Sequence, residues 1–66
     1  MNINKNNLKM LMAIGGLTQE ELSNLAKVSR QTISNIFVRG TCHPKTLLKL
    51  ANALEVEPQE LLKAED

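Results

Sequence analysis

The chain has 66 residues, of which 42% are hydrophobic and one is aromatic, and its formal net charge is +1. A chain of this length buries only about 60% of its unfolded surface, so we expect one small domain and no second domain for catalysis or ligand sensing. No apolar run approaches the roughly 18 residues of a membrane span, and the first residues lack the apolar segment of a secretory signal, so we expect a cytoplasmic protein.

The first predicted helix follows Asn4 and ends near Gly15. The Asn4 side chain can accept hydrogen bonds from free N–H groups of the first turn, and Ile3 can pack on Leu8 across this cap. At the other end, Gly15 and Gly16 supply the backbone freedom with which helices commonly end.

Residues 17–26 predict a second, short helix with strong start signals. Thr18 can cap it and Glu21 can accept a hydrogen bond from the Thr18 backbone, which together form a capping box. Leu17 is placed to pack on the first apolar residue inside the helix. The apolar residues at helical spacing predict a buried stripe of Leu22, Leu25 and Ala26.

The same signals occur again in residues 28–40 and predict a third helix. Ser29 is the expected cap, Val28 is placed to pack on Ile33, and Gly40 can end the helix with a positive φ. The predicted buried stripe consists of Ile33, Ile36 and Phe37.

Only Lys27 and Val28 lie between Ala26, the last residue of the second predicted helix, and Ser29, the expected cap of the third. So short a connection makes the two helices cross steeply. This is the arrangement of a helix-turn-helix, here over about residues 18–38.

The outward side of the third helix is polar. At about 100° per residue, Gln31 and Asn35 lie almost opposite the buried stripe, and no carboxylate occurs from Ser29 through Val38. In the DNA major groove, Gln and Asn can bond bidentately to adenine and Arg to guanine. This face therefore predicts DNA contact, and a solvated face without a ligand is the alternative. The outward and flanking side chains are Arg30, Gln31, Thr32, Ser34, Asn35 and Val38.

Two prolines mark the starts of two further predicted helices. Pro44 and Pro58 stand where first helical residues are expected, and Val56 can pack on Leu61 across the second start. The chain therefore predicts a compact all-α domain over residues 1–66. The expected core comprises Leu8, Leu11, Met12, Leu22, Leu25, Ile33, Ile36, Phe37, Leu47, Leu50, Ala51, Leu54 and Leu61.

Charge is distributed unevenly along the chain. Residues 1–49 carry seven Lys or Arg against two Glu, whereas residues 50–66 carry one Lys against five carboxylates. This asymmetry indicates one end that faces phosphate, although an acidic solubilising tail on a helical bundle gives the same pattern. The candidate phosphate contacts are Lys9, Lys27, Arg39 and Lys45.

Cys42 and His43 are the only residues that invite a chemical interpretation. One Cys and one His cannot supply the four ligands of a structural zinc site, so we expect neither a metal nor another cofactor. A redox role for Cys42 needs a lowered pKa and exposure; the alternative is that Cys42 packs on Leu47 while His43 caps the fourth helix or touches phosphate. Glu20 and Glu21 diverge by about 100° on one helix and cannot face each other as acid and base, so we expect no enzyme.

Three segments together resemble the lambda repressor and Cro superfamily of DNA-binding domains, also called the XRE type: LTQEEL, VSRQTISNI with the following RG, and TLLKLANALEVEPQELL. The resemblance covers nearly the whole chain and implies five helices, with the helix from Ser29 to Val38 in the major groove of double-stranded DNA. It implies that Gln19 bonds a phosphate and braces the first base-reading side chain. The turn position that often holds glycine in this family is Lys27, and a left-handed Lys27 costs roughly 1 kcal/mol. Carried over by position, the base-reading residues are Arg30, Gln31, Ser34 and Asn35, and Thr32 joins the phosphate contacts.

The resemblance implies a transcriptional regulator of prokaryotic or phage origin. We expect a repressor that occludes a promoter, with activation as the alternative, and we expect neither a small-molecule ligand nor a membrane partner. One module offers limited contact area, so we expect a homodimer on a pseudo-palindromic operator with half-sites about 34 Å apart. The other class is a protein-interaction module, such as the antitoxin of a toxin pair or a bridging cofactor, which would expose an apolar patch. The family's usual dimer interface maps here to Leu54, Leu61 and Leu62.

Overall fold

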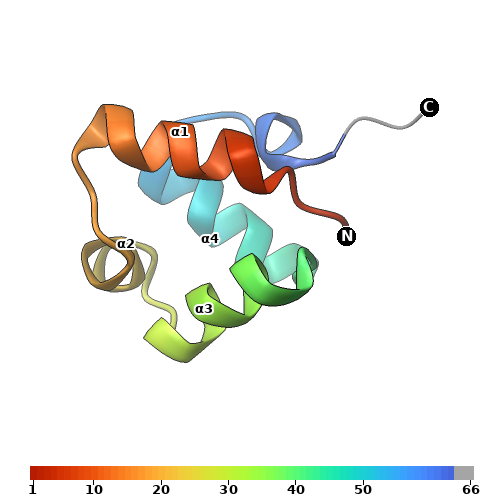
Figure 1. The fold of residues 1–66 in the computed structure, drawn as a ribbon, viewed down its shortest axis with the longest axis horizontal. Helices are drawn as coiled ribbons and strands as arrows, with labels where there is room; N and C mark the ends of the chain where they lie inside the picture. The colour runs from red at the N-terminus through yellow and green to blue at the C-terminus, as the bar shows by residue number, and fades with distance from the viewer. Residues whose placement is uncertain (64–66) are drawn as a thin grey trace.

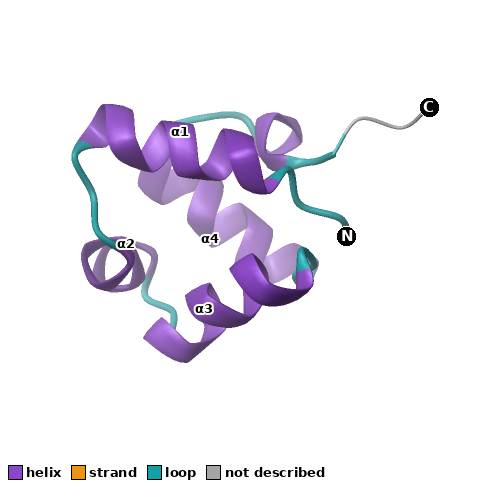
Figure 2. Ribbon diagram, in the orientation of Figure 1, coloured by secondary structure: helices purple, strands orange, loops and turns teal. Residues whose placement is uncertain are grey.

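The computed structural model describes residues 1–63 and contains, within them, four α-helices followed by one turn of 3₁₀-helix (Figures 1 and 2). In Figure 1, α1 crosses the top of the molecule, α3 lies at the bottom, and α4 passes behind them through the middle. The elements are α1 (Lys5–Gly15), α2 (Gln19–Ala26), α3 (Arg30–Arg39), α4 (Pro44–Leu54) and η1 (Pro58–Leu61).

The all-α class is confirmed, whereas the expected count of five α-helices is wrong. Only four residues of the predicted fifth helix are helical, and they form the 3₁₀ turn η1. Leu62 is extended, with φ −89° and ψ 146°, and it forms an antiparallel bridge with Ile3. Because this backbone pairs with the amino-terminal segment, it cannot also continue a helix beyond Leu61.

The predicted starts of α1 and α2 are confirmed by side-chain hydrogen bonds. The Asn4 side chain accepts from the Asn7 N–H at 3.0 Å. The Thr18 hydroxyl accepts from the Glu21 N–H at 3.1 Å, and the Glu21 carboxylate accepts from the Thr18 N–H at 2.9 Å. These bonds satisfy N–H groups that have no partner inside their own helices.

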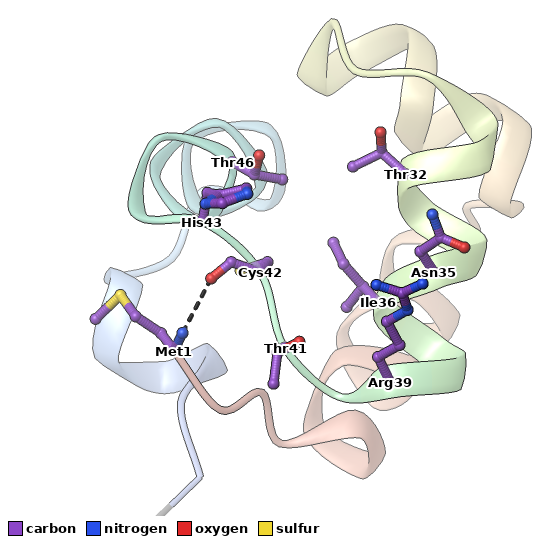
Figure 3. A pocket seen from close by; sticks show the side chains of 9 residues that line it. All are labelled: Met1, Thr32, Asn35, Ile36, Arg39, Thr41, Cys42, His43 and Thr46. Carbon is purple, nitrogen blue, oxygen red and sulfur yellow. Dashed lines mark hydrogen bonds between the residues drawn. The ribbon is translucent and has the colours of Figure 1, made fainter.

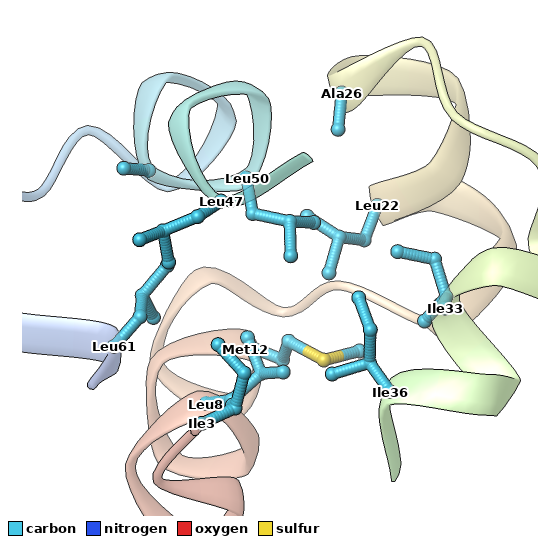
Figure 4. Packing of buried hydrophobic residues seen from close by; sticks show 11 residues of the cluster. Ile3, Leu8, Met12, Leu22, Ala26, Ile33, Ile36, Leu47, Leu50 and Leu61 are labelled. Atoms are coloured by element: carbon cyan, nitrogen blue, oxygen red, sulfur yellow. The ribbon is translucent and has the colours of Figure 1, made fainter. Parts of the chain in front are cut away.

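The core lies between the four α-helices and is closed by η1 (Figure 4). Leu11, Phe37 and Leu54 were expected inside it, but they are half-buried and pack against its edge. Ile3, expected only as a contact across the first cap, is itself buried. The largest fully buried side chains are Leu8, Leu22, Ile33, Ile36, Leu50 and Leu61.

The prediction that Leu25 lies in the core is wrong, because 57% of this residue is exposed. The buried side of α2 consists of Leu22, Ser23 and Ala26, and Leu25 is turned about 100° away from the middle of that stripe. The buried Ser23 hydroxyl donates to the Glu20 carbonyl at 2.7 Å, which satisfies it inside the domain. A polar residue therefore takes the inward place that apolar spacing alone assigned to leucine.

The amino-terminal segment lies along the loop between α3 and α4. The Ile3 N–H donates to the Gly40 carbonyl at 2.7 Å, and the Cys42 N–H donates to the Met1 carbonyl at 3.1 Å. Asn2 and Thr41 form an antiparallel bridge between these two segments. The end of α3 is thus tied to residues distant in the sequence.

Candidate nucleic-acid interface

The turn between α2 and α3 is built on a left-handed lysine. Lys27 has φ 57° and ψ 42°, and the N–H groups of Lys27 and Val28 both donate to the Ser23 carbonyl. This conformation costs a residue with a side chain roughly 1–2 kcal/mol, which the surrounding fold offsets. In Figure 1, α2 is seen nearly end-on while α3 lies across the view, so the two helices cross steeply.

α3 is capped at both ends in the predicted way. Ser29 Oγ accepts from the Thr32 N–H at 3.0 Å and lies 2.7 Å from Thr32 Oγ1. Gly40 ends the helix with φ 73°. Ile33 and Ile36 are buried on the inner side, and this burial fixes which side of α3 faces outward.

The outer side of α3 presents amide and guanidinium groups and no carboxylate. Arg30, Gln31 and Asn35 are exposed there, and Val38 follows one turn after Ser34. The Gln31 side-chain nitrogen Nε2 donates to the Asn35 side-chain oxygen Oδ1 at 3.1 Å. Two of the predicted base-reading side chains are therefore joined to each other.

Ser34 and Gln19 connect α3 to the start of α2. Ser34 is half-buried, and its hydroxyl donates to Gln19 Oε1 at 3.4 Å. The resemblance implied that Gln19 braces the first base-reading side chain, whereas its partner here is Ser34. This bond uses the Gln19 oxygen and leaves the amide hydrogens for another acceptor, such as a phosphate.

An open cleft of about 390 Å³ lies between α3 and the start of α4 (Figure 3). Thr32, Asn35 and Arg39 line it from α3, while His43 and Thr46 line it from the other side. None of its lining residues carries a carboxylate. A guanidinium group and hydroxyls beside the free N–H groups of a helix start form an environment that suits phosphate oxygens.

The predicted phosphate contacts do not all lie in one place. Arg39 lines the cleft, Lys27 is exposed at the end of α2, and Lys45 is exposed at the start of α4. Lys9 is exposed on α1, which lies on the opposite side of the molecule from α3 in Figure 1. Lys9 therefore lies on a different helix from the other candidates.

Lys5 is a cation near α3 that the sequence patterns did not select. A Cβ atom built on Gly40 would lie 3.5 Å from Lys5 Cε, which places this lysine beside the end of α3. No local signal could have found it, because the pairing of the amino-terminal segment with the loop brings it there. Of the predicted acidic end, Glu65 and Asp66 lie outside the described residues.

Cys42 is half-buried, His43 is exposed, and both line the cleft. Burial raises the pKa of the Cys42 thiol above its ordinary value, and the amino-terminal ammonium lowers it to a smaller extent. The raised pKa disfavours the thiolate that a redox switch needs. His43 occupies the cap position of α4, but the expected side-chain cap bond is not formed. Instead its side chain lines the cleft.

The three leucines of the expected dimer interface differ in exposure. Leu61 is 0% exposed, so its side chain belongs to the core and cannot contact a partner, which corrects that part of the prediction. Leu54 and Leu62 are half-buried at the edge of the core. Leu48, by contrast, is 53% exposed on α4.

Two kinds of feature are absent from residues 1–63. No three His, Cys, Asp or Glu side chains gather there in a way that could hold a metal ion. None of the helices in this range has the length and apolar character needed to span a bilayer.

Two short helices joined by a tight turn, the second buried on one side and polar on the other, define a helix-turn-helix domain. A family model described as "Helix-turn-helix" matches residues 8–61. The chain belongs to this family, in its lambda repressor-like or XRE type.

A solved structure described as "Native PhpD with Cadmium Atoms" has a similar fold. The TM-score is 0.85 and the identity is 24%, over 100% of this chain and 14% of that chain. At this identity the likeness shows the fold alone, and this chain spans only a small part of the larger one. No curated protein sequence matches the chain.

Proposed function

We propose that this protein binds specific sites in double-stranded DNA by placing the outer side of α3 in the major groove. The observation that carries the proposal is the position of Gln31 and Asn35, exposed one turn apart and opposite the buried Ile33 and Ile36. Amide side chains there can bond base edges, and Arg30 adds a guanidinium group at the first turn. Ser34 completes the proposed base-reading set, held by its bond to Gln19.

Phosphate contacts on both sides of α3 would position it in the groove. We propose Arg39 and Thr32 in the cleft, Lys45 at the start of α4, and Lys27 and Gln19 on the α2 side. Such contacts fix orientation and add affinity on any sequence, but they carry no base preference.

We further propose that binding represses transcription by occupying a promoter, without catalysis and without a small-molecule effector. Its DNA partner would place the protein in the cytoplasm of a prokaryotic host. Sequence reading by Arg30, Gln31 and Asn35 needs no cofactor, since all the hydrogen-bonding groups belong to the chain.

Two copies on a pseudo-palindromic operator would supply the contact area that one module lacks. The half-buried Leu54 and Leu62, together with the exposed Leu48, are the apolar residues proposed for this contact. Sedimentation of the protein, free and on its operator, tests the proposal. A monomer under both conditions would exclude the homodimer.

The decisive experiment is selection of bound duplexes from a random DNA library at about physiological salt, followed by titration of the selected duplex against scrambled DNA. A palindromic consensus bound at least about a thousandfold more tightly supports the proposal. Weak binding that ignores sequence would contradict it.

A protein-interaction module is the second candidate, and exposed apolar side chains favour it. Ile14 and Met10 on α1, Leu25 on α2 and Leu48 on α4 are all more than half exposed. An antitoxin or bridging cofactor would use such residues, and its binding would be insensitive to substitution of Arg30 or Gln31. Sequence-blind binding in the library experiment would shift the weight to this candidate.

A further inference from the structure

Gln31 and Asn35 form a coupled pair on the outer side of α3. Gln31 Nε2 donates one hydrogen to Asn35 Oδ1 at 3.1 Å, and both side chains are exposed. We infer that this bond makes Gln31 a reader of adenine in preference to guanine. The inference rests on the proposed DNA-binding function and specifies which base that function selects.

The number of hydrogen-bond donors left on the Gln31 amide explains this preference. A free glutamine amide has two N–H donors and one carbonyl acceptor, so it can offer two donors to guanine O6 and N7, or a donor and an acceptor to adenine N7 and N6. In this protein one N–H of Gln31 is already used by Asn35. One donor and one acceptor remain, and this pattern fits the major-groove edge of adenine.

Asn35 keeps a different set of groups. Its carbonyl oxygen accepts from Gln31, while both hydrogens of its Nδ2 remain free. The base edges that accept such donors in the major groove are guanine O6 and N7, adenine N7 and thymine O4. Asn35 Oδ1 also keeps a second lone pair that can accept from the amino group of cytosine, so the bond to Gln31 sets no comparable base preference at Asn35.

The surrounding hydrogen bonds leave this pair isolated. The hydroxyls of Ser29 and Thr32 lie 2.7 Å apart and bond to each other, and the Ser34 hydroxyl bonds to Gln19. Replacing Asn35 therefore removes the acceptor for Gln31 without breaking the other two contacts. Substitution of Asn35 therefore tests whether its hydrogen bond to Gln31 matters, and the quantity measured is the base preference at the position that Gln31 contacts.

The test begins with the selected duplex. The base pair that Gln31 reads is located as the position where Gln31→Ala abolishes preference. Affinity is then measured with A·T at that position and with G paired to 5-methylcytosine, which keeps the methyl group of thymine. We expect the wild-type chain to prefer adenine by about 5- to 150-fold, the range for one bidentate contact.

Variants of Asn35 show whether the adenine preference depends on the Gln31–Asn35 hydrogen bond or on Gln31 alone. Asn35→Ala frees the second Gln31 hydrogen and should reduce the adenine preference to about twofold or less, and the apolar Asn35→Leu, of similar size, should do the same. Asn35→Asp keeps the acceptor and should retain the preference, even as its negative charge lowers affinity on every duplex. Asn52→Ala, at an exposed asparagine on α4 that has no part in the proposed DNA contacts, is the matched control and should leave the adenine preference unchanged.

The outcomes distinguish this inference from the proposed function. A wild-type chain with no preferred duplex would overturn both. A preferred duplex with guanine at the Gln31 position, or an adenine preference that survives both Asn35→Ala and Asn35→Leu, would overturn the coupling and leave DNA recognition intact.

Discussion

The inner and outer sides of α3 are made from the same ten residues but are suited to different tasks. Ile33 and Ile36 lie inside the core, where burying one such side chain stabilises the fold by about 1.5–3 kcal/mol. Gln31 and Asn35 stay exposed and gain little from folding. The comparison predicts that stability and the proposed DNA recognition can be changed separately on one helix.

Substitution on the inner side should have the largest effect. Ile33→Ala removes a side chain that is 0% exposed and should lower the free energy of unfolding by about 2–5 kcal/mol. Urea denaturation followed by circular dichroism measures this loss. The exposed Val38→Ala on the same helix should change stability by less than about 0.5 kcal/mol. Equal losses of unfolding free energy in the two variants would contradict the difference between the inner and outer sides of α3.

Substitution on the outer side should affect binding and spare the fold. Gln31→Ala should cost about 1–3 kcal/mol at the cognate duplex, with little loss on random DNA, because it removes a contact to a base edge. Titration of both duplexes, together with a thermal melt of the free variant, measures the two effects. An equal loss on cognate and random DNA would argue against base reading by Gln31.

A matched pair of charged residues tests the phosphate contact beside α3. Lys27 and Glu55 both occupy left-handed positions at helix ends, with φ 57° and φ 58°. Lys27→Ala should weaken binding about equally on all sequences and reduce the steepness of its log–log salt dependence by about 0.9, since one phosphate contact is lost.

The control for this contact is Glu55→Ala, which changes a side chain at the same backbone geometry after α4. It should leave the salt dependence unchanged. Binding titrations at several salt concentrations compare the two variants. An unchanged slope for Lys27→Ala would exclude the phosphate contact.

The smallest expected effect lies beyond the end of α3, at Cys42. Burial raises the pKa of this thiol in the folded protein, so the unfolded chain ionises first as pH rises. The unfolded state then binds fewer protons than the folded state, and stability falls as pH rises through the unfolded thiol pKa of about 8.5. Urea denaturation across this range should show a slightly steeper decline for the wild-type chain than for Cys42→Ala. A steeper decline in the variant would contradict the sign.

The sequence predicted best those features that depend on residues only a few positions apart in the chain. Thr18 with Glu21, and Ser29 with Thr32, form their cap bonds inside one helical turn. The polar outer side of α3 followed in the same way from helical spacing. The prediction that Leu25 is buried was wrong because helical spacing alone cannot tell which of two neighbouring stripes faces the core. In the structure the buried residue is Ser23.

The amino-acid sequence by itself determined the all-α class, the two caps around a tight turn, and the acid-free outer side of α3, because each depends on residues close together in the chain. Only the tertiary structure decided the rest. It brought Lys5 beside Gly40, buried Leu61, and ended the last helix as the single turn η1. Each of these depends on contacts with the amino-terminal segment or the core, and local propensity carries no information about such distant partners.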